Sequence, residues 1–153
     1  MSHIALFPGS FDPFTNGHHD IVLRTLPLVD KLVIAIGINE SKRPLLTPQQ
    51  RLDYLVALYK DEPRIEVTTY SGLTTDLATE LGARYIIRGL RNTIDFEYER
   101  NIAQINRELT GIETLYIQCS PQYAAISSSA IRELLAFGKP IDHYLPAPLT
   151  TTK

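Results

Sequence analysis

Hydrophobic and polar positions follow two alternating patterns along the chain, continuous aliphatic runs and amphipathic stretches with helical spacing. Short aliphatic runs are typical of buried strands, and apolar residues three or four positions apart are typical of helices. The runs predict strands over residues 3–7, 31–38, 64–69, 83–87 and 113–118. Helical spacing and capping residues predict helices over residues 17–28, 47–59, 74–81, 93–110 and 127–137.

Strands and helices therefore alternate from one end of the chain to the other. Parallel strands need crossover connections, which helices usually provide, so this order predicts a parallel sheet. The run KLVIAIGI at 31–38 is typical of a strand covered on both faces. We predict an α/β, Rossmann-like single domain over residues 1–153, with a five-stranded parallel sheet flanked by helices on both faces. Residues 138–153, which contain three prolines, are predicted to form an irregular tail.

The composition narrows the classes of protein that fit. A chain of 153 residues with 44% apolar content is sufficient for one folded domain. Its net charge of −2 is too balanced for non-specific nucleic-acid binding, and no apolar run approaches the ~20 residues of a membrane span. The single cysteine, Cys119, cannot form an intrachain disulfide, and no signal-peptide pattern is present. We expect a cytoplasmic protein without a membrane or nucleic-acid partner.

Polar residues that interrupt the pattern cluster after the predicted strands. In open parallel sheets, ligands bind beyond the carboxyl ends of the strands. The segments that fall there are residues 8–18, 39–44, 71–74, 88–91 and 120–129. One edge of the sheet is therefore predicted to carry a functional site.

The segment PGSFDPFTNGH at 8–18 links the first strand to the first helix. Gly9 permits close approach of the backbone to a phosphate, and Ser10 adds a hydroxyl donor. His18 lies in the first helical turn, where backbone N–H groups and the helix dipole favour an anion. Turn residues alone would favour a plain turn, but the whole string in this position favours a nucleotide-phosphate site with His18 pointing into it.

Three cationic residues follow other strands at the same edge. Arg88 and Arg91 come directly after the fourth predicted strand, and a guanidinium fork suits a phosphate. The alternative is a pair of surface arginines in a loop, neutralised by nearby acidic residues, for which Asp95, Glu97 and Glu99 on the following helix are the candidates. Lys42, in the loop after the second strand, is a candidate to neutralise a phosphate because of its position at this edge.

Three consecutive serines, Ser127, Ser128 and Ser129, open the last predicted helix. Their hydroxyls and the free N–H groups of the first turn suit a phosphate, although helix capping alone also explains them. No histidine has a carboxylate or cysteine at ligand spacing, so no protein metal site is predicted.

Together these motifs resemble those of nucleotidyltransferases with an (H/T)xGH motif, here TNGH at 15–18, and an ISSSxIR motif, here at 126–132. The strings PGSFDPFTNGH, SKRP, IRGLRN, DFEYE and ISSSAIRE resemble those of bacterial phosphopantetheine adenylyltransferases over residues 3–146. The resemblance implies transfer of AMP from ATP to 4′-phosphopantetheine by in-line displacement, which gives dephospho-coenzyme A and pyrophosphate. It also implies Mg²⁺ with ATP as co-substrate, feedback inhibition by coenzyme A and a homohexamer.

The resemblance also assigns residues to ligands, and His18 matches the family's transition-state stabiliser. The positions that match its phosphopantetheine-binding residues are Ser10, Lys42, Thr74 and Arg88. The positions that match its ATP-binding residues are Ser10, Phe11, His18, Gly89, Leu90, Arg91, Glu99, Tyr123, Ala124, Ala125, Ile126, Ser127, Ser128 and Ser129.

Two alternative functions remain open from the sequence. A related adenylyltransferase or cytidylyltransferase with another acceptor, such as nicotinamide mononucleotide, would keep the fold, but the RGLRN and SKRP strings argue against it. A non-catalytic nucleotide-binding regulatory domain would bind ATP without needing a second phosphate-holding pair such as Lys42 and Arg88.

Overall fold

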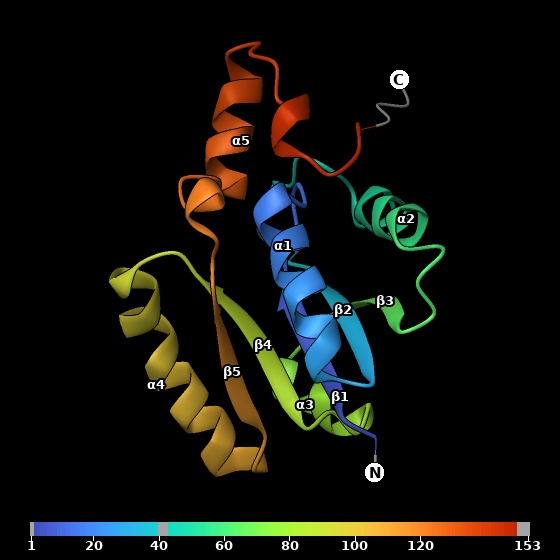
Figure 1. Cartoon of the computed structure of the whole chain (residues 1–153), viewed down its shortest axis with the longest axis vertical. Helices are drawn as coiled ribbons and strands as arrows, with labels where there is room; N and C mark the ends of the chain where they lie inside the picture. Colours follow the sequence, from blue (N-terminus) through green and yellow to red (C-terminus); the bar gives the residue numbers. More distant parts are fainter. Residues whose placement is uncertain (1, 40–42, 150–153) are drawn as a thin grey trace.

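One parallel sheet organises the computed structural model, which describes residues 2–39 and 43–149 (Figure 1). All five strands pair in parallel, in the spatial order β3-β2-β1-β4-β5. The strands are β1 (Ile4–Gly9), β2 (Lys31–Gly37), β3 (Ile65–Tyr70), β4 (Tyr85–Leu90) and β5 (Glu113–Gln118). This arrangement confirms the predicted α/β, Rossmann-like fold class.

The helices are α1 (Asn16–Thr25), α2 (Pro48–Leu58), α3 (Thr74–Glu80), α4 (Thr93–Thr110) and α5 (Ser128–Ala136). Helices α1 and α2 cover one face of the sheet, where Ile21 and Leu55 belong to the same buried cluster as Ile34 of β2. Helix α3 covers the other face, where Ala78 packs with Val33. Strand alternation sends Val33 and Ile34 to opposite faces, so both faces of the sheet are buried.

Helices α1 and α2 both begin with a complete capping box. The side chain of Thr15 accepts from the backbone N–H of His18, and the His18 side chain accepts from the backbone N–H of Thr15. Thr47 and Gln50 make the same reciprocal pair at α2, with Pro48 in the first turn. The first helical turn after β1 is therefore fixed by local chemistry.

Three predicted boundaries are wrong. Strand β1 extends through Pro8–Gly9, and β4 extends through Arg88–Leu90, where the sequence pattern predicts a loop. Residues 88–90 pair with residues 116–118 of β5, and this non-local pairing outweighs their polar, glycine-containing local sequence. The predicted helix 17–28 divides into α1 and a short 3₁₀ helix, Leu26–Leu28, because Pro27 lacks the N–H that an α-helix needs.

The segment that follows α5 packs back onto the molecule. It contains one short 3₁₀ helix, Asp142–Tyr144, and buries Ile141 and Leu145 against Ile131 of α5. The hydroxyl of Tyr54 on α2 donates to the carbonyl of Ala147 at 2.7 Å. Residues 138–149 therefore connect α5 to α2, whereas residues 150–153 lie outside the described part of the chain.

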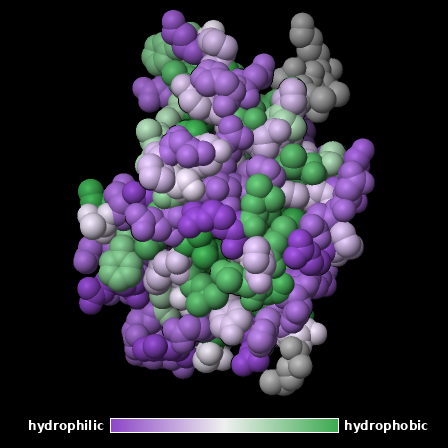
Figure 2. All heavy atoms as spheres, viewed as in Figure 1, coloured by the Kyte–Doolittle hydropathy of each residue, from purple (hydrophilic) through white to green (hydrophobic). Residues whose placement is uncertain are grey.

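Figure 2 shows hydrophobic side chains gathered in the lower centre of the face that carries α1, with hydrophilic side chains around them. Among the described helices, none is long and apolar enough to cross a bilayer.

Candidate active site

A cavity of about 430 Å³ opens at the carboxyl ends of β1 and β4, beside the first turns of α1 and α5. Its position agrees with the rule that open parallel sheets bind ligands at this edge. The predicted site residues that line it are Ser10, Phe11, His18, Arg88, Gly89, Arg91, Glu99, Tyr123, Ile126, Ser127, Ser128 and Ser129.

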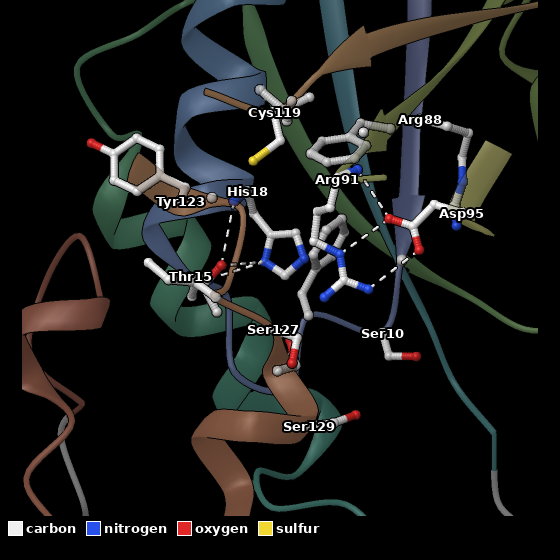
Figure 3. A pocket seen from close by; sticks show the side chains of 18 of the residues that line it. Ser10, Thr15, His18, Arg88, Arg91, Asp95, Cys119, Tyr123, Ser127 and Ser129 are labelled. Atoms are coloured by element: carbon white, nitrogen blue, oxygen red, sulfur yellow. Dashed lines mark hydrogen bonds and ion pairs between the residues drawn. The ribbon is translucent and has the colours of Figure 1, made fainter. Parts of the chain in front are cut away.

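His18 is oriented by the loop that precedes it. Its Nδ1 accepts a hydrogen bond from the backbone N–H of Thr15 at 3.0 Å, so Nδ1 must carry a lone pair and the neutral ring carries its proton on Nε2. Figure 3 shows the His18 ring beside Thr15, with Arg91 and Ser127 bordering the same space. The ring nitrogen that is not bonded to Thr15, Nε2, is therefore a hydrogen-bond donor.

Burial, followed by the positive charges of Arg88 and Arg91, lowers the pKa of His18 from 6.5 to about 4. The rings of Phe11 and Phe14 contact the imidazole, with ring centroids 5.1 and 5.2 Å away. Apolar surroundings and neighbouring cations both disfavour an imidazolium ion. His18 is therefore a neutral hydrogen-bond donor at pH 7.

Two arginines at the end of β4 are held by carboxylates of α4. Arg88 forms a two-point ion pair with Glu99 at 3.1 and 2.6 Å, and its Nη1 also donates to the carbonyl of Pro8 at 2.9 Å. Arg91 pairs with Asp95 through its Nε at 3.2 Å (Figure 3). Both guanidinium groups are thus oriented before any substrate binds.

A second cavity, of about 220 Å³, lies on the α3–α4 side of the sheet. It is lined by Thr74 and by Tyr98 and Asn106 of α4, and the hydroxyls of Thr74 and Tyr70 are hydrogen-bonded at 2.8 Å. The two cavities share three lining residues, Pro8, Arg88 and Glu99. The Arg88–Glu99 pair therefore stands at the junction of two hollows.

The first turn of α5 is bonded to the loop between β1 and α1. Ser128 Oγ donates to the carbonyl of Pro13 at 2.8 Å, and Arg132 donates to the carbonyl of Asp12 at 2.8 Å and to Ser129 Oγ at 3.1 Å. Ser127 caps the helix by accepting from the N–H of Ala130. Ser127 thus caps α5, and the bonds of Ser128 and Arg132 to the loop hold the positive end of the helix at the cavity.

Four of the predicted residues do not line the first cavity. Thr74 lines the second cavity, and Leu90, Ala124 and Ala125 line neither. Lys42 lies outside the described residues.

Sequence reasoning missed several residues of the first cavity. Arg132 lines it, and no ion pair joins Arg132 to a carboxylate in the described chain. Its place in the ISSSAIRE string was a usable signal. Cys119 also lines the cavity, and burial raises the pKa of its thiol, which disfavours a nucleophilic thiolate. Ile21 lies so close to Gly89 that a Cβ there would be 3.1 Å from the Ile21 side chain.

Comparisons with known proteins agree with this geometry. The model of the cytidylyltransferase-like family matches residues 6–134. The phosphopantetheine adenylyltransferase of Porphyromonas gingivalis is 49% identical over 144 residues, which cover 94% of each chain. The chain belongs to the phosphopantetheine adenylyltransferase family.

Another member, from Flavobacterium johnsoniae, is 44% identical over 149 residues, which cover 97% of this chain and 98% of the relative. A solved Vibrio parahaemolyticus structure, described as a nicotinate-nucleotide adenylyltransferase, superposes with a TM-score of 0.68 at 24% identity. It covers 95% of this chain and 94% of its own, and it supports the fold. The family is one of enzymes that transfer nucleotidyl groups.

Proposed function

We propose that this enzyme transfers the adenylyl group of ATP to 4′-phosphopantetheine at the junction of the two cavities. The observation that carries this proposal is the shared position of Arg88, which lines both hollows. A reaction between two anionic substrates needs a cation where they meet, because like charges must be brought into contact. The proposal places ATP in the first cavity and the pantetheine arm of the acceptor in the second, beside Thr74.

The chemistry requires no covalent enzyme intermediate. An oxygen of the acceptor's terminal phosphate attacks the α-phosphorus of ATP, a new P–O bond forms, and the bond to the β-phosphate oxygen breaks to release pyrophosphate. A phosphate monoester is already a nucleophile at neutral pH, so no strong general base is needed. Arg88 would orient the attacking phosphate, while Arg91 and Arg132 would attract the polyphosphate.

His18 would act as a neutral donor to the α-phosphate. Its Nε2–H can hydrogen-bond a non-bridging oxygen as negative charge builds there, and the Thr15 bond fixes the ring in advance. A donor that is already oriented needs no rearrangement during the reaction. Ser10, Phe11 and the first turn of α5, near Tyr123, would complete the phosphate-binding surface.

Mg²⁺ would enter with the nucleotide. The described residues contain no group of three or more histidine, cysteine, aspartate or glutamate side chains suited to a metal ion. The carboxylates in the first cavity, Asp95 and Glu99, are both paired with arginines. Mg²⁺ commonly binds through substrate phosphates and water with few protein ligands, so these residues fit an ion carried by ATP. It would supply charge neutralisation on the polyphosphate.

The exposed face of helix α4 supports self-association, which the proposed homohexamer requires. Its apolar residues Ile94, Tyr98, Ile102, Ile105 and Leu109 are exposed and recur every three or four positions. Ile94 is 78% exposed and Leu109 is 68% exposed, which is costly for a helix that remains in water. Contact with a second copy of the chain would bury this stripe. Tyr98 and Ile102 also line the second cavity, so assembly and acceptor binding would share residues.

Coenzyme A would inhibit by occupying the second cavity, since it contains the same pantetheine arm as the acceptor. Competition between coenzyme A and 4′-phosphopantetheine in calorimetric titrations would support this assignment. Simultaneous binding of both would contradict it.

The direct test of the reaction is incubation with ATP, Mg²⁺ and 4′-phosphopantetheine, with detection of dephospho-coenzyme A by mass. Pantetheine without its phosphate, nicotinamide mononucleotide and nicotinate mononucleotide serve as matched acceptors. Of these four acceptors, the proposal expects only 4′-phosphopantetheine to receive the adenylyl group. Product from a mononucleotide would favour the related adenylyltransferase, and ATP binding without any product would favour a regulatory domain.

A further inference from the structure

Arg51 is a buried cation that the proposed reaction does not use. It lies on α2, is 5% exposed and lines neither cavity. Its Nη1 donates to the carbonyl of Ser10 at 2.8 Å, and its Nε donates to the carbonyl of Leu46 at 3.2 Å. No ion pair with a carboxylate is present within the described residues. Among the described residues its partners are carbonyls, and a buried charge held in this way is costly, so its position needs a reason.

The residue that follows Ser10 has an unusual backbone. Phe11 has φ of 50°, and it is the one non-glycine residue with positive φ in the described chain. Its ring is buried and contacts Phe7, Phe14 and His18. A Cβ at Gly9 would come within 2.8 Å of this ring, so the glycine makes room for it. Left-handed backbone at a bulky residue persists only where its surroundings hold it.

The orientation of the Ser10–Phe11 peptide follows from these contacts. This bond is trans, because Asp12–Pro13 is the cis peptide bond of the described chain. In a trans peptide the carbonyl and the next N–H point in opposite directions. The Ser10 carbonyl points to Arg51, which does not line the cavity. The Phe11 N–H is therefore turned toward the cavity that Ser10, Phe11 and His18 line.

The partners of Arg51 are themselves held in place. The carboxylate of Asp12, which is 6% exposed, accepts from the N–H groups of Leu45 and Leu46 at 2.7 and 2.8 Å. The Leu46 residue thus binds Asp12 through its N–H and Arg51 through its carbonyl. These bonds join the loop after β1 to the residues that precede α2.

We propose that Arg51 is a positioning residue for adenylyl transfer: by holding the Ser10 carbonyl, it fixes the Phe11 N–H as a second donor to the α-phosphate, beside His18. The proposal rests on the proposed function, because it names a donor for that reaction. Arg51 touches no substrate and acts only through the Ser10–Phe11 peptide. Its loss therefore affects the rate of the chemical step more than the binding of either substrate.

A first experiment needs no variant. The amide nitrogen and proton of Phe11 are followed by NMR in the wild-type protein as α,β-methylene-ATP and Mg²⁺ are added. The proposal expects a downfield shift of the Phe11 amide proton, while the amide of Ala35, buried in β2, stays in place. An unshifted Phe11 amide at saturation overturns the proposal. A shift with the analogue, together with no formation of dephospho-coenzyme A in a separate assay with ATP and 4′-phosphopantetheine, supports the donor and contradicts the proposed function, so the two failures are distinguishable.

The second experiment compares Arg51→Gln and Arg51→Lys with the control Leu55→Val, which weakens packing of α2 one turn further on. The two diastereomers of ATPαS, which differ in the α-phosphate oxygen replaced by sulfur, serve as substrates beside ATP. Arg51→Gln should lower kcat roughly 100-fold, leave both KM values within about threefold and reduce the preference between diastereomers. Arg51→Lys, with a single donor nitrogen, should be intermediate.

Leu55→Val should lower the unfolding temperature without changing kcat or the diastereomer preference. A folded Arg51→Gln protein, verified by circular dichroism, with wild-type kcat and wild-type preference overturns the proposal. If Arg51→Gln does not fold, Arg51→Lys decides by the same measurements, and wild-type kcat with wild-type diastereomer preference in folded Arg51→Lys overturns the proposal.

Discussion

The backbone N–H of Thr15 donates to Nδ1 of His18 at 3.0 Å, and this bond sets which ring nitrogen faces the cavity. The same pair closes the capping box of α1, because Thr15 Oγ1 accepts from the His18 N–H. A local helix-start motif therefore also sets the tautomer of the candidate catalytic histidine. Glutamine, the residue that performs this role in α2, would cap the helix but would present no ring N–H.

The protonation state of His18 should be constant across the range in which an ordinary histidine titrates. With a pKa of about 4, the ring should remain neutral from pH 8 to pH 5.5, with its proton on Nε2. Nitrogen-15 NMR of the imidazole measures both properties. A midpoint near pH 6.5, or a proton on Nδ1, would contradict the geometry.

The capping threonines provide a matched pair of variants. Thr15→Ala and Thr47→Ala each remove the hydroxyl of a complete capping box, so each should cost about 1 kcal/mol of stability. Thr15→Ala keeps the backbone N–H that binds His18 but removes the hydroxyl that lies 3.3 Å from Nδ1 of the same ring, so it should lower kcat while Thr47→Ala should not. Urea unfolding and steady-state kinetics on both proteins check this. Equal kcat values for Thr15→Ala and Thr47→Ala would show that the Thr15 hydroxyl caps α1 without contributing to catalysis.

Stability should depend on pH through His18. The unfolded imidazole binds a proton near pH 6.5, whereas the folded one does so only near pH 4, so the unfolded state binds more protons between these values. The contribution of His18 is therefore present above pH 6.5 and is lost as pH falls toward 4. His18→Gln lacks this loss. The free energy of unfolding of the wild-type protein, relative to that of His18→Gln, should therefore decrease as the pH is lowered from 7.5 to 5. Parallel stability curves for the two proteins would contradict the lowered pKa of His18.

Arg88 should not be replaceable by lysine. Its guanidinium binds Glu99 at two points and the Pro8 carbonyl at a third, which an ammonium group cannot reproduce. Arg88→Lys should raise the KM for 4′-phosphopantetheine about tenfold or more and the KM for ATP less. Arg64→Lys, which alters the exposed pair with Glu62, is the control. Equal losses for both substrates would reject the junction role.

The sequence predicted the fold where local pattern and tertiary structure agree. Aliphatic runs marked every strand, and the rule that ligands bind at the carboxyl ends of parallel strands correctly gathered His18, Arg88 and Ser127 at one edge. Of the three carboxylates named as possible partners of these arginines, Asp95 and Glu99 pair with them and Glu97 pairs with Arg100 instead; the pairing does not exclude a phosphate role. The position of the site and the candidate partners of the arginines could both be predicted from the order of elements along the chain and the charges of the residues.

What the sequence did not show depends on contacts between distant segments. Arg51 reads as a polar position on an amphipathic helix, yet the fold buries it beneath the Ser10 loop. Arg88 reads as a loop residue, yet its hydrogen-bonded neighbour on β5 places it in a strand. The division of the site into two hollows depends on how α4 packs beside β4, which no local signal specifies.

Replacement of His18, with the neighbouring His19 as control, tests most directly whether adenylyl transfer depends on this imidazole. His19 hydrogen-bonds Tyr59 at 2.8 Å and does not line the cavity. In single-turnover assays with ATP, Mg²⁺ and 4′-phosphopantetheine, His18→Ala should form dephospho-coenzyme A roughly 100- to 1,000-fold more slowly than wild type, a loss of about 3 kcal/mol. His19→Ala should stay within about threefold of wild type. Turnover by a folded His18→Ala protein at the wild-type rate would contradict the account.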